Sequence, residues 1–420
     1  MGKTRTKSRS NSRDVLRSTK TPLVKSSVNS KSQKSTEDLL QEAATHLDHS
    51  QPEQALALVQ EALKRLESDA AAYRDVDVLL QNAAQEKATF PSALVLGGDI
   101  SLAMGDVDEA RAQYEMAVKI DPNGALVSAE PYLQLAQICE EGGQKSIYYF
   151  DKAIEVMRNE IEVLDEQMEI EGTKEIVDGR RARVADALCG MAEVYMTDLS
   201  WEPDAEQCCE QLVTEAVALC PDMLSAGVLQ TLASVRISQK RVDEAKRALA
   251  RSVSLWKDVP EGIDDPARPD FATRVALARL LMEVEQEEDA LTVVQGLVKE
   301  DDQSVEALYL GGWCHVLLSQ KADNSAETRS VQSEQARERL GNCLKLYRKI
   351  AYEDEPLRQH AEELVQQLNK DLNLDEEADG WETEEEQDDQ DDNADIEADD
   401  VDHARDQEKD VEMTPDRLQD

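Results

Sequence analysis

The central part of the chain, residues 36–374, repeats its apolar side chains at the spacing of one face of an α-helix. Segments such as LLQEAATHL (39–47) and RVALARLLMEV (274–284) place Ala, Leu and Val at i, i+3, i+4 and i+7. Aromatic residues make up only 4% of the chain. The pattern therefore predicts an all-α protein with a core of Ala, Leu and Val.

One segment, residues 92–122, predicts a complete helix–turn–helix unit. Its sequence, SALVLGGDISLAMGDVDEARAQYEMAVKIDP, has a turn around Gly105 and ends at Pro122. Tyr114 is expected to fill the gap between the two helices. Small residues are expected where these helices approach closely, at Gly98, Ala110 and Ala117. This arrangement resembles the tetratricopeptide repeat, which stacks into a superhelix with a concave groove.

The same spacing returns along the rest of the central region. The step from Ala or Gly to an Ala twelve residues later recurs in several units, and ALYLGGWC (307–314) echoes ALVLGGDI (93–100). We expect about seven helix–turn–helix units, a capping helix at EPLRQHAEELVQQLNKDL, and insertions at 201–208 and 322–335. The alternative is an unrelated helical bundle with Ala-rich faces. Small or core positions mark the other units: Ala43, Ala55, Val59 and Ala62; Ala136, Phe150 and Ala153; Ala192, Tyr195, Val213, Ala216 and Pro221; Ala233, Ala245, Leu249 and Ser252; Ala278, Ala290 and Val294; and Ala336, Leu340 and Cys343.

Charge divides the chain into three zones. Residues 1–35 carry ten Lys or Arg against one acid and are rich in Ser, while residues 375–420 carry 23 Asp or Glu against three bases. Both segments are predicted to be disordered, because neither can bury enough apolar surface to offset its chain entropy. The tetratricopeptide array, residues 36–374, is itself acidic within a chain of net charge −43.

This composition excludes several classes of protein. Nucleic-acid phosphates would be repelled over most of the surface, so no direct nucleic-acid partner is expected. No apolar run is long enough for a transmembrane helix, and the N-terminus lacks the apolar stretch of a signal peptide. Seven cysteines without a C-x-x-C motif predict free thiols. We therefore expect a protein of the cytoplasm and nucleus.

The basic N-terminus allows three interpretations. MGKTRT matches the pattern for N-myristoylation at Gly2, with Thr6 at its end. The dispersed Lys and Arg residues would also suit a nuclear-import sequence. A solubilising tail is the third interpretation.

The candidates for chemistry are weak. His46 and His49 lie three residues apart on a predicted helix, where two surface or interhelical histidines are the favoured interpretation over a shared ion. Cys208 and Cys209 are adjacent, so their side chains diverge and core packing is expected. The segment 389–400 has calcium-loop spacing without the required glycine, terminal glutamate or flanking helices. We expect no enzyme, no metal and no cofactor.

In tetratricopeptide arrays the first helix of each unit lines the concave face. By that resemblance, acidic and aromatic side chains are expected to face the groove, with Arg279 as the only base. An acidic groove favours a basic partner, which long-range attraction would steer into place. The predicted partner-binding residues are Glu37, Asp99, Glu130, Glu140, Asp186, Glu193, Glu283, Glu306, Tyr309 and Trp313.

The whole layout resembles one family. A seven-unit repeat core, a basic Ser-rich N-terminus and an acidic tail containing GWETEEEQDD are similar to the fungal assembly chaperone of large-ribosomal-subunit protein four. The resemblance implies a dedicated holding and escort chaperone, which binds the long basic loop of that ribosomal protein in its groove as a one-to-one complex. The alternative is a generic repeat scaffold or a histone-type escort subunit of a larger complex.

Overall fold

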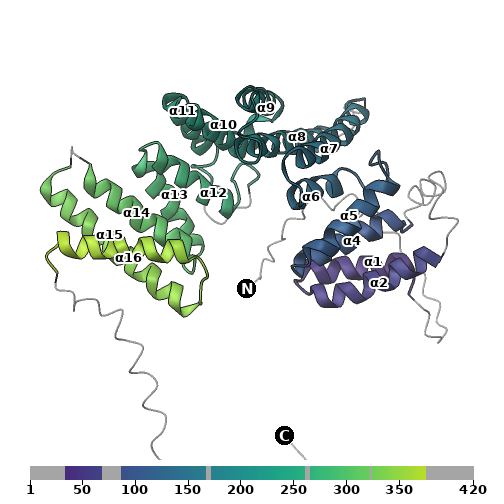
Figure 1. The fold of residues 1–420 in the computed structure, drawn as a ribbon, viewed down its shortest axis with the longest axis horizontal. Helices are drawn as coiled ribbons and strands as arrows, with labels where there is room; N and C mark the ends of the chain where they lie inside the picture. Colours follow the sequence, from purple (N-terminus) through teal and green to yellow (C-terminus); the bar gives the residue numbers. More distant parts are fainter. Residues whose placement is uncertain (1–33, 69–86, 167–171, 261–264, 322–323, 375–420) are drawn as a thin grey trace, which may run out of the picture.

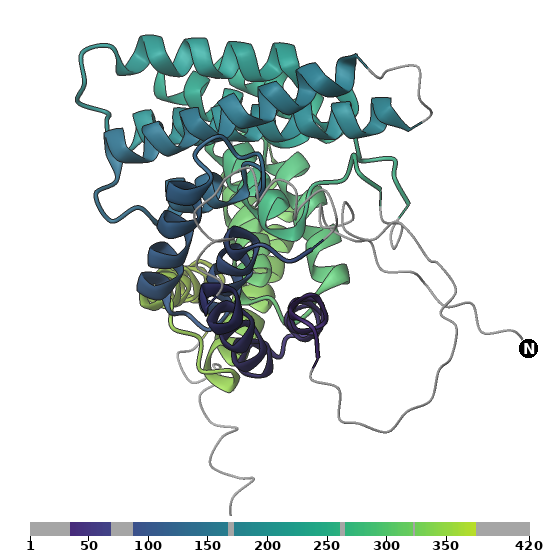
Figure 2. The same cartoon turned by 90° about the vertical axis from the view of Figure 1, so that its right-hand side faces the viewer.

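A computed structural model describes residues 34–68, 87–166, 172–260, 265–321 and 324–374 (Figures 1 and 2). Over these ranges the chain forms fifteen α-helices and one short 3-10 helix, with no strand. This confirms the all-α prediction. The predicted disorder of the two termini, the myristoylation pattern and the calcium-like segment lie outside the described residues.

The helices are arranged as seven antiparallel pairs followed by a single helix, as the repeat spacing predicts. The first helices are α1 (Thr36–Asp48), α4 (Phe90–Ala103), α6 (Glu130–Ile138), α8 (Thr173–Met196), α10 (Ala226–Ser238), α12 (Phe271–Glu283) and α14 (Val305–Gln320). The second helices are α2 (Pro52–Ser68), α5 (Val107–Ile120), α7 (Gly143–Asp165), α9 (Ala205–Leu219), α11 (Val242–Ser254), α13 (Glu287–Glu300) and α15 (Ala326–Lys349). The short η2 (Asp222–Leu224) precedes α10, and α16 (Glu355–Asp371) ends the array.

Local sequence signals set where these helices begin. Ser35 and Asp38 form a reciprocal capping box at the start of α1, and Thr89 and Ser92 form another at α4. The turn between α4 and α5 contains Gly105 at φ 80°, a conformation that glycine adopts without steric cost. Side chains at the N-cap thus satisfy backbone N–H groups that the helix leaves without partners.

Each pair depends on a close approach between a small residue and a large one. A Cβ at Gly98 would lie 2.6 Å from the ring of Tyr114, and a Cβ at Gly312 would lie 2.6 Å from Leu340 Cγ. Tyr114 is fully buried. The sequence-based expectation that Tyr114 fills the gap beside Gly98 is confirmed.

The pairs follow one another around an arc (Figure 1). Consecutive first helices are in contact, as between α8 and α10, α10 and α12, and α12 and α14. In Figure 1 α10 and α12 lie toward the inner side of the arc, while α9, α11 and α13 lie on its outer side. The helices α7 and α8, with 23 and 24 residues, cross the top of the arc in Figure 2.

The structure corrects the two predicted insertions. Helix α15 begins at Ala326, so most of the segment predicted as an insertion at 322–335 is helical, and its N-cap is Ser325. The other insertion is shorter than expected, because α9 already begins at Ala205. The loop before α9 is held by the buried side chain of Leu199 and by Asp198, which accepts a hydrogen bond from the backbone N–H of Gly143.

The last helix, α16, covers the apolar end of the array. It has one buried face against the core that α14 and α15 build. The residues of this face recur at helical spacing: Leu357, Ala361, Val365 and Leu368. The prediction of a capping helix is confirmed.

The packing of Gly312 generates a test of the register. Gly312→Ala should destabilise the protein by about 1–3 kcal/mol, because the added methyl group overlaps Leu340. Gly341→Ala in α15 is the matched control. Its Cβ would meet no atom within 4 Å, so loss of backbone entropy in the unfolded chain should stabilise it by about 0.5–1 kcal/mol. Urea unfolding followed by circular dichroism compares the two, and equal effects would refute the assigned register.

Candidate functional site

Apart from Glu140, which lies beyond the end of α6, and Glu283, the predicted carboxylates occupy two fixed positions relative to the small residue of their first helix. A residue six positions before it and the residue directly after it are seven apart, so they lie two turns apart on one face of the helix. In α8 these two positions are Asp186 and Glu193, before and after Ala192. In α14 they are Glu306 and Trp313, before and after Gly312.

Ion pairs between neighbouring first helices show where this face lies. Arg183 of α8 pairs with Glu130 of α6, and Arg279 of α12 pairs with Glu306 of α14. Both pairs join one first helix to the next, so Glu130 and Glu306 lie on the side of their helix that faces a neighbouring first helix. Arg183 is a second base there, besides the predicted Arg279. Its position three residues before Asp186 is a sequence signal that the prediction missed.

Five of the eight predicted carboxylates are engaged within the protein. Besides Glu130 and Glu306, Asp99 accepts a hydrogen bond of 2.8 Å from Tyr114 Oη, and exposed Glu140 pairs with Arg111 at 3.5 Å. Glu37 accepts a hydrogen bond of 3.2 Å from the backbone N–H of Ala88. These five acids therefore help to hold the array together, whatever else they bind.

The other three carboxylates, Asp186, Glu193 and Glu283, form no hydrogen bond or ion pair with any residue that the structure describes. All three are solvent-exposed. Nevertheless, desolvation by surrounding protein raises the pKa of Asp186 to about 6, with Arg183 lowering it, and desolvation also raises the pKa of Glu193. An exposed carboxylate with a raised pKa is expected on an inward-curving surface, where protein crowds the side chain without covering it. A cationic partner would therefore stabilise the ionised form of such a carboxylate.

The predicted aromatic residues lie together near the C-terminal end. The rings of Tyr309 and Trp313 are 5.7 Å apart, and both pack against His360 of α16. Tyr309 Oη lies 2.7 Å from His360 Nδ1. Tyr309 is buried at 8% exposure, whereas Trp313 is half-buried. The sequence prediction missed His360, because the contact spans 51 residues.

The candidates for chemistry have ordinary structural roles. His46 Nδ1 bonds Gln51 and His49 Nδ1 bonds the Thr45 carbonyl, both inside the helix–turn region of the first pair. Burial raises the pKa of the Cys189 and Cys220 thiols to about 12, which keeps both thiols protonated and unreactive. Across the described ranges no group of three or more His, Cys, Asp or Glu is placed to hold a metal ion.

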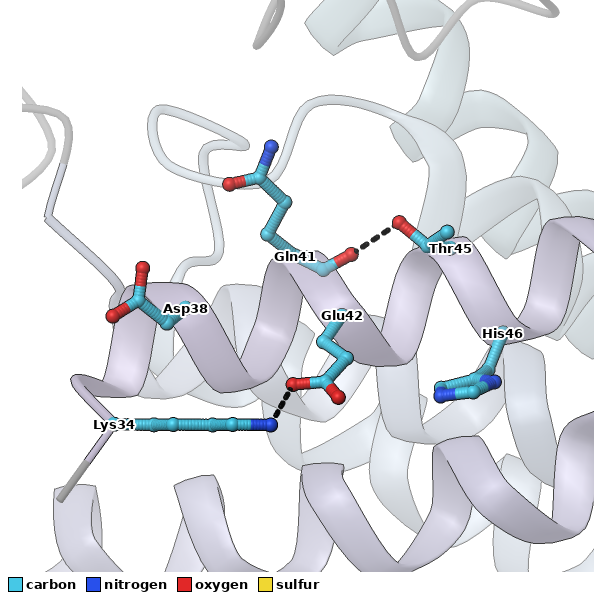
Figure 3. A pocket seen from close by; sticks show the side chains of 6 residues that line it. All are labelled: Lys34, Asp38, Gln41, Glu42, Thr45 and His46. Carbon is cyan, nitrogen blue, oxygen red and sulfur yellow. Dashed lines mark hydrogen bonds and ion pairs between the residues drawn. The ribbon is translucent and has the colours of Figure 1, made fainter. Parts of the chain in front are cut away.

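A surface hollow lies on α1 (Figure 3). It is open and polar, and its side chains already interact: Lys34 pairs with Glu42, and Thr45 donates to the carbonyl of Gln41. It encloses no group suited to catalysis. None of the helices that the structure describes is long and apolar enough to span a membrane.

Known proteins resemble the chain in both sequence and fold. Residues 91–123 match the model of the tetratricopeptide repeat. The chain is 38% identical over 357 residues to the "probable assembly chaperone of rpl4" of Emericella nidulans, covering 81% of this chain and 83% of that protein. The chain belongs to the family of Rpl4 assembly chaperones. The fission yeast member, from Schizosaccharomyces pombe, is 36% identical over 307 residues, covering 70% and 86% of the two chains.

A solved structure of this family supports the assignment. The assembly chaperone of RpL4, residues 1–338, matches with a TM-score of 0.58 at 38% identity, over 68% of this chain and 98% of that one. The resemblance predicted from the repeat core and the charged termini is thereby confirmed. The Rpl4 assembly chaperones are repeat scaffolds and no catalytic family, in agreement with the prediction that the chain is not an enzyme.

The raised pKa of Asp186 generates a test on stability. Its folded-state pKa of about 6 lies above the ordinary value of 3.8, so its contribution to stability is complete below pH 3.8 and is lost as the pH rises through about 6. Asp186→Asn cannot ionise and avoids that loss. The melting temperature of the variant, relative to that of the wild type, should therefore rise between about pH 4.5 and pH 6.5 and stay level at higher pH.

Glu355→Gln is the control of opposite sign. Hydrogen bonds from Arg358 and Gln359 lower the pKa of Glu355 to about 2, so its contribution is present above the ordinary value of 4.5 and is lost only as the pH falls through about 2. Over the same pH interval the Glu355→Gln variant should keep a nearly constant deficit in melting temperature. A flat difference for Asp186→Asn as well would contradict the environment assigned to Asp186.

Proposed function

We propose that this chain is an assembly chaperone of the ribosomal protein Rpl4 and holds a basic segment of that protein on the inner side of its arc. The family membership supports the partner, because the fungal relatives carry the name of Rpl4 assembly chaperones. The unmatched, desolvated carboxylates of α8 support the place of binding. The observation that carries the proposal is that the carboxylates of Asp186 and Glu193 are exposed and desolvated and form no ion pair with a described residue.

The mechanism is electrostatic capture followed by local contact. The net charge of −43 attracts a strongly basic chain from a distance and orients it before contact. Each exposed ion pair then contributes only about 0–1 kcal/mol, so several must act together. Lys or Arg side chains of the partner would neutralise Asp186 and Glu193, which no residue described within the chain neutralises. Covering the basic segment would keep it from aggregating or binding RNA before ribosomal RNA and neighbouring proteins compete for it.

We further propose a one-to-one complex that travels between cytoplasm and nucleus. The basic N-terminal segment and the acidic tail would act as accessories. The tail carries 23 carboxylates that would screen or compete for further basic surface. Removing residues 381–420 should therefore alter the salt dependence of binding more than the binding itself.

The basic test is reconstitution with Rpl4 from the same organism. The full chain should keep Rpl4 soluble at low salt, and light scattering after size exclusion should give one copy of each protein. A tagged chain from the native host should recover Rpl4 as its dominant, near-stoichiometric partner. Absence of Rpl4, or recovery of several stable non-ribosomal proteins or histones, would instead support the scaffold or histone-escort alternative.

The double variant Asp186→Asn/Glu193→Gln tests the proposed place of binding. It should weaken binding to Rpl4 by about tenfold at low salt, and by less at high salt, where surface charge is screened. The matched control is Glu115→Gln/Glu206→Gln on the second helices α5 and α9, which makes the same change in net charge with exposed residues. Equal losses in both double variants would show that total charge, rather than the inner face of α8, determines binding.

A further inference from the structure

The inner side of the arc changes its chemistry between α8 and α14. At the position directly after the small residue, α8 carries Glu193 and α14 carries Trp313. Six positions before the small residue, both helices carry an acid, Asp186 or Glu306. The two helices therefore present equivalent positions with different side chains: two acids on α8, and one acid with one tryptophan on α14.

Two carboxylates near the aromatic residues of α14 have partners within the chain, in contrast to those of α8. Glu306 pairs with Arg279. Asp354, whose charge influences both Tyr309 and Tyr352, accepts a hydrogen bond of 3.0 Å from the backbone N–H of Leu357. Both carboxylates beside the aromatic rings are thus already engaged.

Two aromatic clusters near this end of the array each leave one ring partly exposed. Trp313 is half-buried and packs edge-on against His360 at 5.3 Å. Tyr352 is 38% exposed and packs against Tyr347 at 5.8 Å. Arg279 lies near both clusters, since burial raises the pKa of Tyr309 and of Tyr352 and the charge of Arg279 lowers it. Aromatic residues on rigid supports are the side chains that most often dominate binding interfaces.

We infer that Trp313, supported by Tyr309 and His360, forms an apolar anchoring site for the same extended segment whose basic residues bind at α8. This inference rests on the proposed function. Because Trp313 offers a partly exposed ring and Glu306 is already paired with Arg279, the site takes a large apolar or aromatic side chain rather than a further Lys or Arg. Equivalent positions of successive first helices lie along the same side of the array, so one extended peptide can contact both sites.

The spacing between the two sites follows from helix packing. Helices α8, α10, α12 and α14 are consecutive first helices, so three interhelical steps of about 8–10 Å separate α8 from α14. An extended chain advances about 3.3 Å per residue, so the apolar anchor lies about eight residues from the basic cluster. The partner segment is therefore bipartite and binds in one direction.

The first experiment compares two tryptophans for binding to Rpl4. Trp313→Ala should weaken binding by about tenfold at both low and high salt, because an apolar contact is little screened. Trp201→Ala is the control, since Trp201 is 73% exposed and lies on the loop between α8 and α9 rather than on a first helix. It should bind like the wild type. A folded Trp313→Ala variant that binds within about twofold of the wild type overturns the inference.

A second measurement avoids any loss of folding. In the wild-type chain labelled with 5-fluorotryptophan, Rpl4 should shift the fluorine resonance of Trp313, assigned with Trp313→Phe, and leave that of Trp201 in place. Designed peptides then test the spacing. The first peptide carries four lysines and one leucine about eight residues to one side of them. It should bind more tightly than a peptide in which alanine replaces this leucine, and more tightly than a peptide whose leucine lies only about four residues from the lysines.

The two proposals fail in different ways. If the wild type binds no Rpl4, the proposed function is wrong and the anchor falls with it. A second case is that the wild type binds Rpl4 and Asp186→Asn/Glu193→Gln reduces the salt dependence of binding. If in that case Rpl4 does not shift the fluorine resonance of Trp313 and Trp313→Ala binds like the wild type, only the anchoring site is wrong. Equal affinity of all peptides, whatever the position of the leucine, overturns the bipartite segment.

Discussion

The contact between a small residue on each first helix and a large side chain on the second determines the geometry of the array. Gly98 against Tyr114 and Gly312 against Leu340 let the paired helices approach closely, which fixes the rotation of each first helix about its axis. That rotation decides which residues turn inward. The orientation of Asp186, Glu193 and Trp313 is therefore a consequence of packing on the opposite side of the same helices.

The number and kind of elements could be predicted from the sequence, because the twelve-residue step between small residues reports a local contact. The helical content of 326–335 could not, since its polar sequence lacks the apolar periodicity that predicted the other helices. The distinction among the groove acids also escaped prediction. Glu130 meets Arg183 across 53 residues and Asp186 meets no base in the same way, although both lie on the inner side of first helices.

The acids that form ion pairs within the chain thus differ in role from the acids that form none. Acids that pair with Arg across neighbouring first helices contribute to the joint between repeats, and their replacement would affect shape as well as binding. The desolvated acids of α8 store unfavourable energy in the isolated protein, which a cationic partner relieves. The same desolvation that destabilises the ionised carboxylates would favour the proposed binding of a basic chain.

The capping helix α16 also limits what copies of the chain can do to one another. A repeat array that ended at α15 would display an apolar face of the kind that each repeat uses to receive the next. Such an end could receive the first repeat of another copy, and because this head-to-tail contact is heterologous it need not close, so open filaments could grow. By occupying this face with Leu357, Ala361, Val365 and Leu368, the chain terminates its own polymerisation.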